Sequence, residues 1–360
     1  MTGGPPKVLV VDDTEANVDV LVGTLDAVYD VRVAMDGAGA LEAVSEEKPD
    51  MILLDVMMPG MDGYEVCRRL KANAATNDIP VIFLTAMTSE SDEARGLALG
   101  AVDYIAKPFS PELVKSRVNN QIELKRYRDK LEDLVRERTA ELAATQEVAI
   151  YCLASLTETR DPETGGHILR TQRYVRLLAE RLSLLPEYRD SLNDATIDLL
   201  YKSAPLHDIG KVGVPDAILR KPGKLTHEEF EEMKRHTVYG LRALRMAEKR
   251  LGSNSFMRLA AEIAYSHHEK WDGSGYPRGV GGAEIPVSGR IMALADVYDA
   301  LVSRRVYKEP FPHDRAISVV AEGRGTSFDP GMTDCFLGVG DEIGEIAREF
   351  PDDDISDKEE

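Results

Sequence analysis

Short, nearly continuous runs of apolar residues in the first third of the chain constrain its fold most strongly. The runs are KVLVVDD, DMILLDV, PVIFLTA and DYIAKPF, and the first three are rich in valine, isoleucine and leucine. Such runs are typical of strands in a parallel sheet that is covered on both faces. Helical stretches such as NVDVLVGTLD and GYEVCRRLKAN lie between them. The alternation predicts a doubly wound α/β domain.

Polar side chains stand where these runs end, and they are Asp12, Asp13, Asp55, Thr85 and Lys107. The carboxyl ends of parallel strands meet at one edge of a sheet, so we expect the five groups to converge. Carboxylates that converge repel one another unless they hold a cation, and oxygen ligands suit Mg²⁺. A hydroxyl and an ammonium group beside them suit a transferred phosphoryl group. A single Asp often does no more than end a strand, but five such groups at four strand ends indicate a site.

Residues 5–125 resemble the receiver domain of two-component response regulators. The strings VDD, DVMMPGMDG, LTA and DYIAKP occur in the order of that family. The resemblance implies a flavodoxin-like fold over residues 1–125, in which Asp55 accepts a phosphoryl group from a histidine kinase. Asp12 and Asp13 would hold Mg²⁺ together with Asp55. Three further residues would respond to the phosphorylated state: Thr85, Tyr104 and Lys107.

A helical linker is expected over residues 111–147. Between Pro111 and Gln146 the chain has no glycine and no further proline. Apolar residues recur at spacings of three and four, the pattern fails at Arg138, and it resumes at Leu142; the seam begins with Leu124, Tyr127, Leu131 and Leu134. The pattern predicts one long helix that forms a parallel coiled coil in a homodimer. The alternative is an amphipathic helix that packs on its own domain.

Five of the seven histidines, all after the predicted helical linker, occur in short motifs that can be combined with carboxylates into one candidate site. With three carboxylates they form a candidate ligand set: Glu163, His167, His207, Asp208, His236, His267, His268 and Asp296. Nitrogen and oxygen ligands without a thiolate suit iron and manganese, with nickel, cobalt and zinc as alternatives. Eight ligands exceed one ordinary site, so two or three metal ions are implied. Two cations close together supply a nucleophile for phosphoester cleavage. The other two histidines, His227 and His313, stand near helix starts and are read as ordinary residues.

The adjacent pair His267 and His268 needs a special backbone position. Neighbours on a regular helix point about 100° apart and do not converge. The glycines and the proline that follow in DGSGYP predict a helix end there, which can aim both imidazoles at metal ions.

Residues 148–345 resemble the HD-GYP family of HD phosphohydrolases. The strings are long and specific: HDIGKVGVPDAILRKPGKLT, HHEKWDGSGYPRG, ADVYDALVSRRVYK and SFDP. The resemblance implies an all-α domain that hydrolyses cyclic di-GMP, with the eight residues above as metal ligands and Asp208 and Lys211 as catalytic residues. Lys211 would hold a substrate phosphate. Substrate contacts are also implied for Tyr276, Arg305 and Lys308. The loop around Tyr276 would cover a guanine or dock a partner protein, although it also fits a rigid turn that only aims the two histidines. The departures from the family pattern, Lys270 and Val306, remove no ligand.

Together these features predict a response regulator in which phosphorylation of Asp55 controls a metal-dependent phosphodiesterase. The expected products are linear pGpG, GMP or both. One alternative is a metal-loaded receptor that signals through protein contacts. Others are a phosphodiesterase for a mixed GMP–AMP cyclic dinucleotide and a nucleotidase for mononucleotides. The sign of the phosphorylation effect stays open.

The charge and the cysteines limit the partners and the location of the chain. A net charge of −19 argues against binding along a nucleic-acid polymer, which needs basic stripes. The last residues, 346–360, are expected to form an acidic, disordered tail. Three widely spaced cysteines suggest a reduced, cytoplasmic protein. No run approaches the roughly 18 apolar residues of a membrane span.

Overall fold

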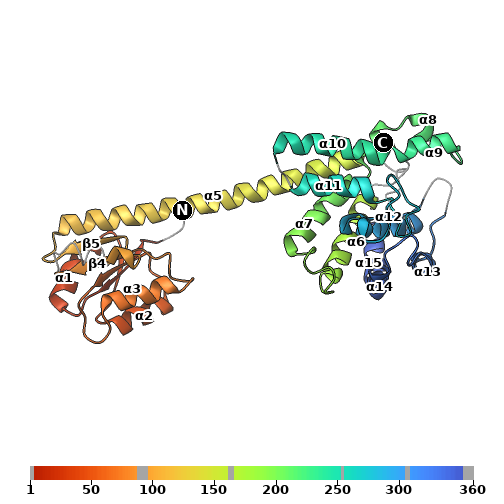
Figure 1. Ribbon diagram of the computed structural model, residues 1–360. Helices are drawn as coiled ribbons and strands as arrows, with labels where there is room; N and C mark the ends of the chain where they lie inside the picture. The colour runs from red at the N-terminus through yellow and green to blue at the C-terminus, as the bar shows by residue number, and fades with distance from the viewer. Residues whose placement is uncertain (1–3, 87–95, 161–165, 253–254, 305–308, 352–360) are drawn as a thin grey trace. The chain divides into compact units, whose positions relative to one another are not determined.

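The computed structural model describes residues 4–86, 96–160, 166–252, 255–304 and 309–351 (Figure 1). The chain forms two compact units, Met1–Ala140 and Glu141–Glu360. Three of the expected site residues, Glu163, Arg305 and Lys308, lie outside the described residues. A disordered tail was expected over residues 346–360, but residues 346–349 belong to the helix Gly340–Glu349, whose Ile346 and Ala347 pack against the core. Residues 352–360 lie outside the described residues.

Unit 1 contains a five-stranded parallel sheet with the order β2-β1-β3-β4-β5, which is the flavodoxin-like order. The strands are β1 (Lys7–Val11), β2 (Asp30–Ala34), β3 (Met51–Asp55), β4 (Val81–Thr85) and β5 (Asp103–Ala106). Every residue of β3 and β4 is buried, because both faces of these central strands are covered. The continuous apolar runs therefore correspond to central strands, and the α/β prediction is confirmed.

Helices on both faces of this sheet complete its core (Figure 1). Leu21 and Leu25 of α1 (Glu15–Leu25) pack with Val114 and Val118 of α5 (Pro111–Glu158) on one face. On the opposite face lie α2 (Gly37–Glu46) and α3 (Gly63–Ala72), which bury Val44 and other apolar side chains. The side chain of Asp62 caps α3 by accepting a hydrogen bond from the amide of Glu65. This packing fixes the carboxyl ends of the strands at one edge.

Helix α5 is 48 residues long and contributes to both units. Its first turns are buried in unit 1, whereas Ala154 and Thr157 are buried in unit 2. Residues 130–149 are exposed on all sides of the helix. The apolar seam lies within or beside this stretch, and its side chains are 43–69% exposed at Leu124, Tyr127, Leu131, Leu134 and Leu142.

Apart from one isolated β-bridge between Arg324 and Phe328, the regular secondary structure among the described residues of unit 2 is helical, so the prediction of an all-α domain is confirmed. Its α-helices are α6 (Gly166–Leu182), α7 (Asp194–Ser203), α8 (Asp216–Leu219), α9 (His227–Lys234), α10 (His236–Leu251), α11 (Ser255–Ser266), α12 (Val287–Val302), α13 (His313–Glu322), α14 (Pro330–Gly338) and α15 (Gly340–Glu349). Short 3₁₀ turns occur at η1 (Ala204–Leu206), η2 (Ile209–Gly213) and η3 (Gly282–Glu284). The main core lies between α6, α7 and α12 to α15, and Tyr174, Tyr298 and Phe336 are fully buried in it.

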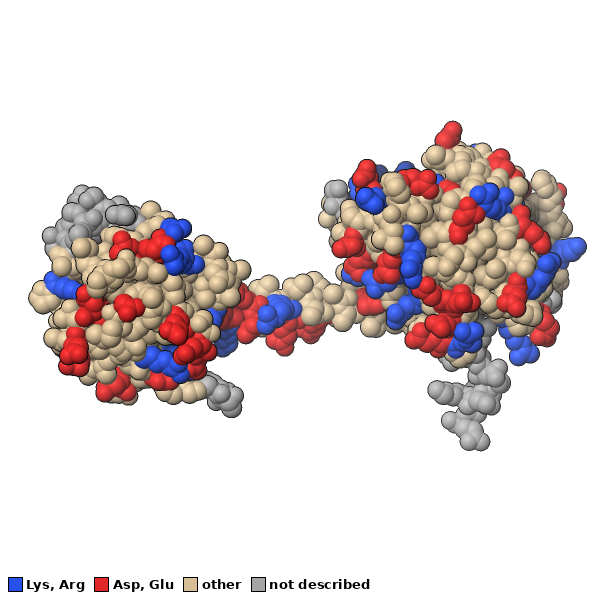
Figure 2. Space-filling model, turned by 90° about the horizontal axis from the view of Figure 1, so that it is seen from below, with Lys and Arg blue, Asp and Glu red and all other residues tan. Residues whose placement is uncertain are grey.

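The surface carries both signs of charge. Figure 2 shows acidic side chains on the visible face of each unit with Lys and Arg between them. In a chain with a net charge of −19, binding of an anion therefore requires local positive charge. Within the described ranges, none of the helices is long and apolar enough to cross a membrane.

Candidate metal centre and phosphoacceptor site

One group of ligand atoms in unit 2 comes from Asp208, His236, His267 and His268, and these atoms lie within 4.8 Å of one another. Asp208 separates η1 from η2, and His236 begins α10. The two adjacent histidines directly follow the end of α11 at Ser266, as the sequence predicts. The Nε2 atoms of His236 and His267 lie 3.2 and 3.4 Å from Asp208 Oδ1. Two histidines thus face one oxygen of the same carboxylate.

A second group consists of His167, His207 and Asp296, which come from the first turn of α6, the end of η1 and the middle of α12. The Nε2 atoms of both histidines lie 4.0 Å from Asp296 Oδ1. His207 Nε2 is also 3.5 Å from Asp208 Oδ2. Asp208 therefore presents one oxygen to each group. Neither group includes His227 or His313, in keeping with their reading as ordinary residues.

The hydrogen bonds of the histidine rings leave their Nε2 atoms as acceptors. The Nδ1 atoms of His207, His236 and His267 lie 2.8–3.1 Å from the carbonyls of Ala204, Met233 and Ile263. A carbonyl only accepts, so each Nδ1 carries the hydrogen and each Nε2 offers a lone pair. Within the part of the chain that the structure describes, these three Nε2 atoms and Asp208 Oδ1 are buried without a hydrogen bond of good geometry. Buried acceptors that face one another fit divalent cations bound between them.

The protonation states suit metal binding. Burial lowers the pKa of His207, and burial with two neighbouring imidazoles holds the pKa of His268 well below its usual value. Burial alone would raise the pKa of Asp208, but Lys211, whose Nζ lies 2.7 Å from Asp208 Oδ2, helps to hold that pKa well below its usual range. His267 differs: burial alone would lower its pKa, but its hydrogen bond with Asp208 and the charges of Asp208 and Asp296 raise it. Neutral imidazoles and a charged carboxylate are the ligand forms that cations need.

In unit 1, Asp12, Asp13 and Asp55 form a third group of ligand atoms within 4.8 Å of one another. Lys107 Nζ lies 2.7 Å from Asp12 Oδ2 and 2.8 Å from Asp55 Oδ2. Burial raises the pKa of Asp55, although Lys107 opposes that shift. The predicted convergence at the strand ends is therefore present in the geometry, with both buried carboxylates bound to one ammonium group.

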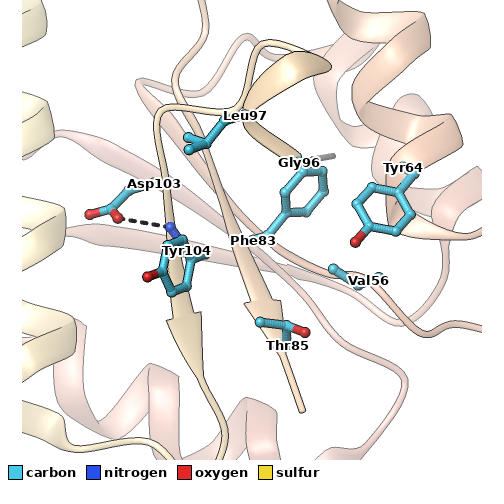
Figure 3. A pocket seen from close by; sticks show the side chains of 8 residues that line it. All are labelled: Val56, Tyr64, Phe83, Thr85, Gly96, Leu97, Asp103 and Tyr104. Atoms are coloured by element: carbon cyan, nitrogen blue, oxygen red, sulfur yellow. Dashed lines mark hydrogen bonds between the residues drawn. The ribbon is translucent and has the colours of Figure 1, made fainter. Parts of the chain in front are cut away.

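A small cavity lies beside this group, and Figure 3 shows that Thr85 and Tyr104 both line it. Thr85 ends β4, while Tyr104 lies on the neighbouring β5 opposite Phe83. The guanidinium of Arg117 lies 5.5 Å from the centre of the Tyr104 ring. The two predicted response residues thus border the same space, next to the strand ends that carry the acidic group.

Comparison with known proteins identifies both units. The response regulator receiver domain matches residues 8–119, and the HD domain matches residues 131–332, more than half of the chain. A Vibrio cholerae protein named "Probable cyclic di-GMP phosphodiesterase" is 49% identical over 96% of this chain and 80% of its own length. The chain belongs to the family of response regulators with a receiver domain and an HD-GYP domain.

Two further relatives match different shares of the chain. The "Cyclic di-GMP phosphodiesterase response regulator RpfG" of Xanthomonas campestris is 34% identical over 96% of this chain and 90% of its own length. The "3'3'-cGAMP-specific phosphodiesterase 2" of Vibrio cholerae is 41% identical over 59% of this chain and 38% of its own length.

The loop that gives the HD-GYP domain its name packs directly on His268, one of the candidate ligands. The Tyr276 ring lies 4.7 Å from the His268 ring, at 33° to it, and the Tyr276 amide donates to the His268 carbonyl at 3.1 Å. A Cβ at Gly275 would collide with the backbone of Lys270, so only glycine fits there. The buried Glu269 accepts hydrogen bonds from the amides of Arg278 and Gly279 at 2.8 and 3.1 Å. The loop therefore supports the position of His268, and a contact of Tyr276 with substrate stays a prediction.

Sequence reasoning missed two buried residues of the HD-GYP domain, Arg170 and Asp299. Asp299 lies three residues after Asp296 on α12, and its Oδ2 is 2.8 Å from His167 Nδ1. Arg170 and His167 lower the pKa of Asp299 to about 2, although burial alone would raise it. The signal available in ADVYDAL was the spacing of its two aspartates, since residues three apart lie on one helix face. Glu269 was missed as well, and no pattern in the sequence distinguishes it from a surface acid.

Proposed function

We propose that this chain is a metal-dependent phosphodiesterase that hydrolyses cyclic di-GMP and is regulated by phosphorylation of Asp55. The observation that carries the proposal is the meeting of two ligand groups at Asp208, with buried Nε2 acceptors on both sides. The full-length relatives named as cyclic di-GMP phosphodiesterases support the substrate.

The two groups would hold at least two divalent ions. His167, His207 and Asp296 would bind one ion, with Glu163 as a further ligand outside the described residues. His236, His267 and His268 would bind another, and Asp208 would bridge the two. Mixed nitrogen and oxygen ligands favour iron or manganese over magnesium. Such ions, when bound, polarise a phosphate oxygen and make a bound water acidic enough to act as a nucleophile at neutral pH.

The chain's own residues would bind the substrate and balance its charge. The side chain of Lys211 is only 12% exposed, and its ammonium group lies beside Asp208 in the candidate metal centre. Its charge would offset that of the phosphate under attack, which the acidic surface cannot do. Tyr276 offers an aromatic face beside His268 for a guanine base. Arg305 and Lys308 would add positive charge at the entrance to the site.

The receiver domain would supply the regulation. A histidine kinase would phosphorylate Asp55 with Mg²⁺ held by Asp12, Asp13 and Asp55. The phosphoryl group adds about −1.5 to −2 charge beside Lys107, which now bridges the two buried carboxylates. That change would be read by Thr85 and Tyr104, which border one cavity.

Two copies of the chain would associate through α5. Its seam residues remain 43–69% exposed, and exposed apolar side chains at spacings of three and four fit a parallel coiled coil. The loop around Tyr276 is a second candidate surface, for a partner protein. We place the protein in the cytoplasm, where its three free cysteines would stay reduced.

The decisive experiment combines metal analysis with product identification. Protein purified without oxygen is analysed for bound metal and then incubated separately with cyclic di-GMP and 3'3'-cGAMP. We expect linear pGpG to appear first, followed by GMP, with cyclic di-GMP as the faster substrate. Faster cleavage of 3'3'-cGAMP would identify the mixed dinucleotide as the substrate instead. The 41% identity to a protein named as a cGAMP-specific phosphodiesterase is the reason to test this alternative. Tight binding without product, in protein that contains its metals, would identify a receptor and refute hydrolysis.

A further inference from the structure

His167 is held differently from the other ligand histidines whose Nδ1 contacts are known. His207, His236 and His267 donate to carbonyls only three or four residues earlier in the chain. His167 is the second residue of α6. Its Nδ1 donates instead to the Asp299 carboxylate at 2.8 Å, across 132 residues of sequence.

Asp299 is itself held by a bidentate ion pair with Arg170, one turn after His167 on α6. Arg170 Nε lies 2.6 Å from Oδ1 of Asp299, and Arg170 Nη2 lies 2.9 Å from Oδ2. The side chains of Asp299, His167 and Arg170 are 0%, 4% and 3% exposed. Because these side chains are almost fully buried, the two parallel hydrogen bonds from the Arg170 guanidinium fix the orientation of the Asp299 carboxylate and keep it ionised.

Two further hydrogen bonds of Arg170, within the described residues, reach other segments. Its Nη1 donates to the carbonyl of Phe350 at 2.7 Å, just beyond the end of α15, and its Nη2 donates to Ser303 Oγ at 2.7 Å, just beyond the end of α12. A Cβ at Gly166 would come within 3.0 Å of the Pro351 carbonyl, so the chain after α15 packs tightly against the start of α6. The end of α15 is therefore connected to His167 through two side chains, Arg170 and Asp299.

We propose that Asp299 and Arg170 are positioning residues for the metal centre, and that the chain end after α15 completes their support. Asp299 fixes the hydrogen of His167 on Nδ1 and aims Nε2 toward Asp296. It also makes this imidazole a stronger electron donor than one that is bonded to a carbonyl. The ion held by His167, His207 and Asp296 depends on this support, whereas the ion on the far side of Asp208 does not. This inference rests on the proposed metal centre.

The test compares two substitutions in the full chain, Asp299→Asn and Asp329→Asn. Asp329 is the matched control because it is also a buried acid paired with an arginine, Arg290 at 2.6 Å, in the same domain. Its carboxylate also accepts hydrogen bonds from the Tyr188 hydroxyl and from the amides of Gly331 and Met332. Both substitutions break a buried ion pair, but only Asp299→Asn alters a histidine ligand.

Metal-free proteins are titrated with Mn²⁺, and free Mn²⁺ is measured by its EPR signal. Excess Mg²⁺ occupies the oxygen-only site of the receiver domain and competes poorly for imidazoles. We expect Asp299→Asn to weaken binding of one equivalent of Mn²⁺ by about 10- to 100-fold and to leave the other unchanged. Asp329→Asn should lower the melting temperature while both equivalents bind as in the wild type.

Wild-type affinity for both equivalents in folded Asp299→Asn would overturn the inference, as would an equal loss in Asp329→Asn. If Asp299→Asn does not fold, Arg170→Lys is tested in its place. Lysine keeps the positive charge but cannot make the bidentate hydrogen bonds, so binding of the same equivalent of Mn²⁺ should weaken. An unchanged Arg170→Lys titration would then refute the proposal. A wild-type protein that binds no Mn²⁺ beyond the receiver site would refute the metal centre itself, which separates the two failures.

Discussion

Replacing Lys211 by methionine should reduce turnover while the metals stay bound. Lys211 Nζ lies 2.7 Å from Asp208 Oδ2, and the two side chains are only 12% and 13% exposed. In the proposed reaction the same ammonium group faces the substrate phosphate. A hydrogen bond to a charged group contributes about 1.5–3 kcal/mol, and each 1.4 kcal/mol is a factor of ten. We therefore expect kcat/KM for cyclic di-GMP to fall about 10- to 150-fold.

The metal content should not fall in this variant, because removing a positive charge next to Asp208 strengthens the attraction between that carboxylate and cations. Lys202→Met is the matched control, since Lys202 also pairs with an aspartate, Asp198 at 2.5 Å, but at a surface where the lysine is 36% exposed. Exposed pairs contribute about 0–1 kcal/mol, so its turnover should stay near that of the wild type. The assay is initial-rate hydrolysis at matched metal content. Unchanged kcat/KM in Lys211→Met would remove this lysine from the mechanism, and loss of metal together with activity would make it a support of the metal centre.

Three further predictions concern the ligands, the receiver domain and α5. His268→Ala should lose metal and activity together, measured as metal per chain and product per minute; a full metal content would exclude His268 as a ligand. Asp55→Ala should keep the circular dichroism spectrum of the wild type but abolish any response of the hydrolysis rate to a small phosphodonor, and a retained response would place the phosphoacceptor elsewhere. Leu131→Glu, on the α5 seam, should shift sedimentation equilibrium toward monomer, whereas Lys130→Glu beside the seam should not; equal behaviour of the two variants would argue against a coiled coil.

The sequence was sufficient to predict the fold of the receiver domain. Strands β3 and β4 are covered on both faces, so almost every residue in them is apolar and the pattern is unambiguous. The end of helix α5 was harder to predict from the sequence. Residues 130–149 are exposed on all sides, so no core-facing pattern marks the passage into the second unit. The helix then runs to Glu158, because Ala154 and Thr157 become buried there. Only the packing of unit 2 reveals that extension.

The types of the candidate ligands were also suggested by the sequence, because five imidazoles occur with carboxylates in one domain. Their division into two groups around Asp208 was not, since it depends on which atoms approach which oxygen. His236 and His267 face Oδ1 of this carboxylate, while His207 lies near Oδ2. A sequence gives the carboxylate but not the direction of its two oxygens.

The residues that support the ligands divide into local and distant partners, and only the local kind can be read from a sequence. A histidine near the end of a helix or turn finds a carbonyl three or four positions back, as His267 does at Ile263. Position in a helix does not decide the kind of partner, because His236 begins α10 and still finds the Met233 carbonyl three residues back. His167 instead takes a partner from another element. For His167 that partner is Asp299, and Asp299 in turn depends on Arg170, which lies 129 positions away from it. A support of this distant kind becomes visible only in the packed fold, where a buried acid from another helix lies against the histidine ring.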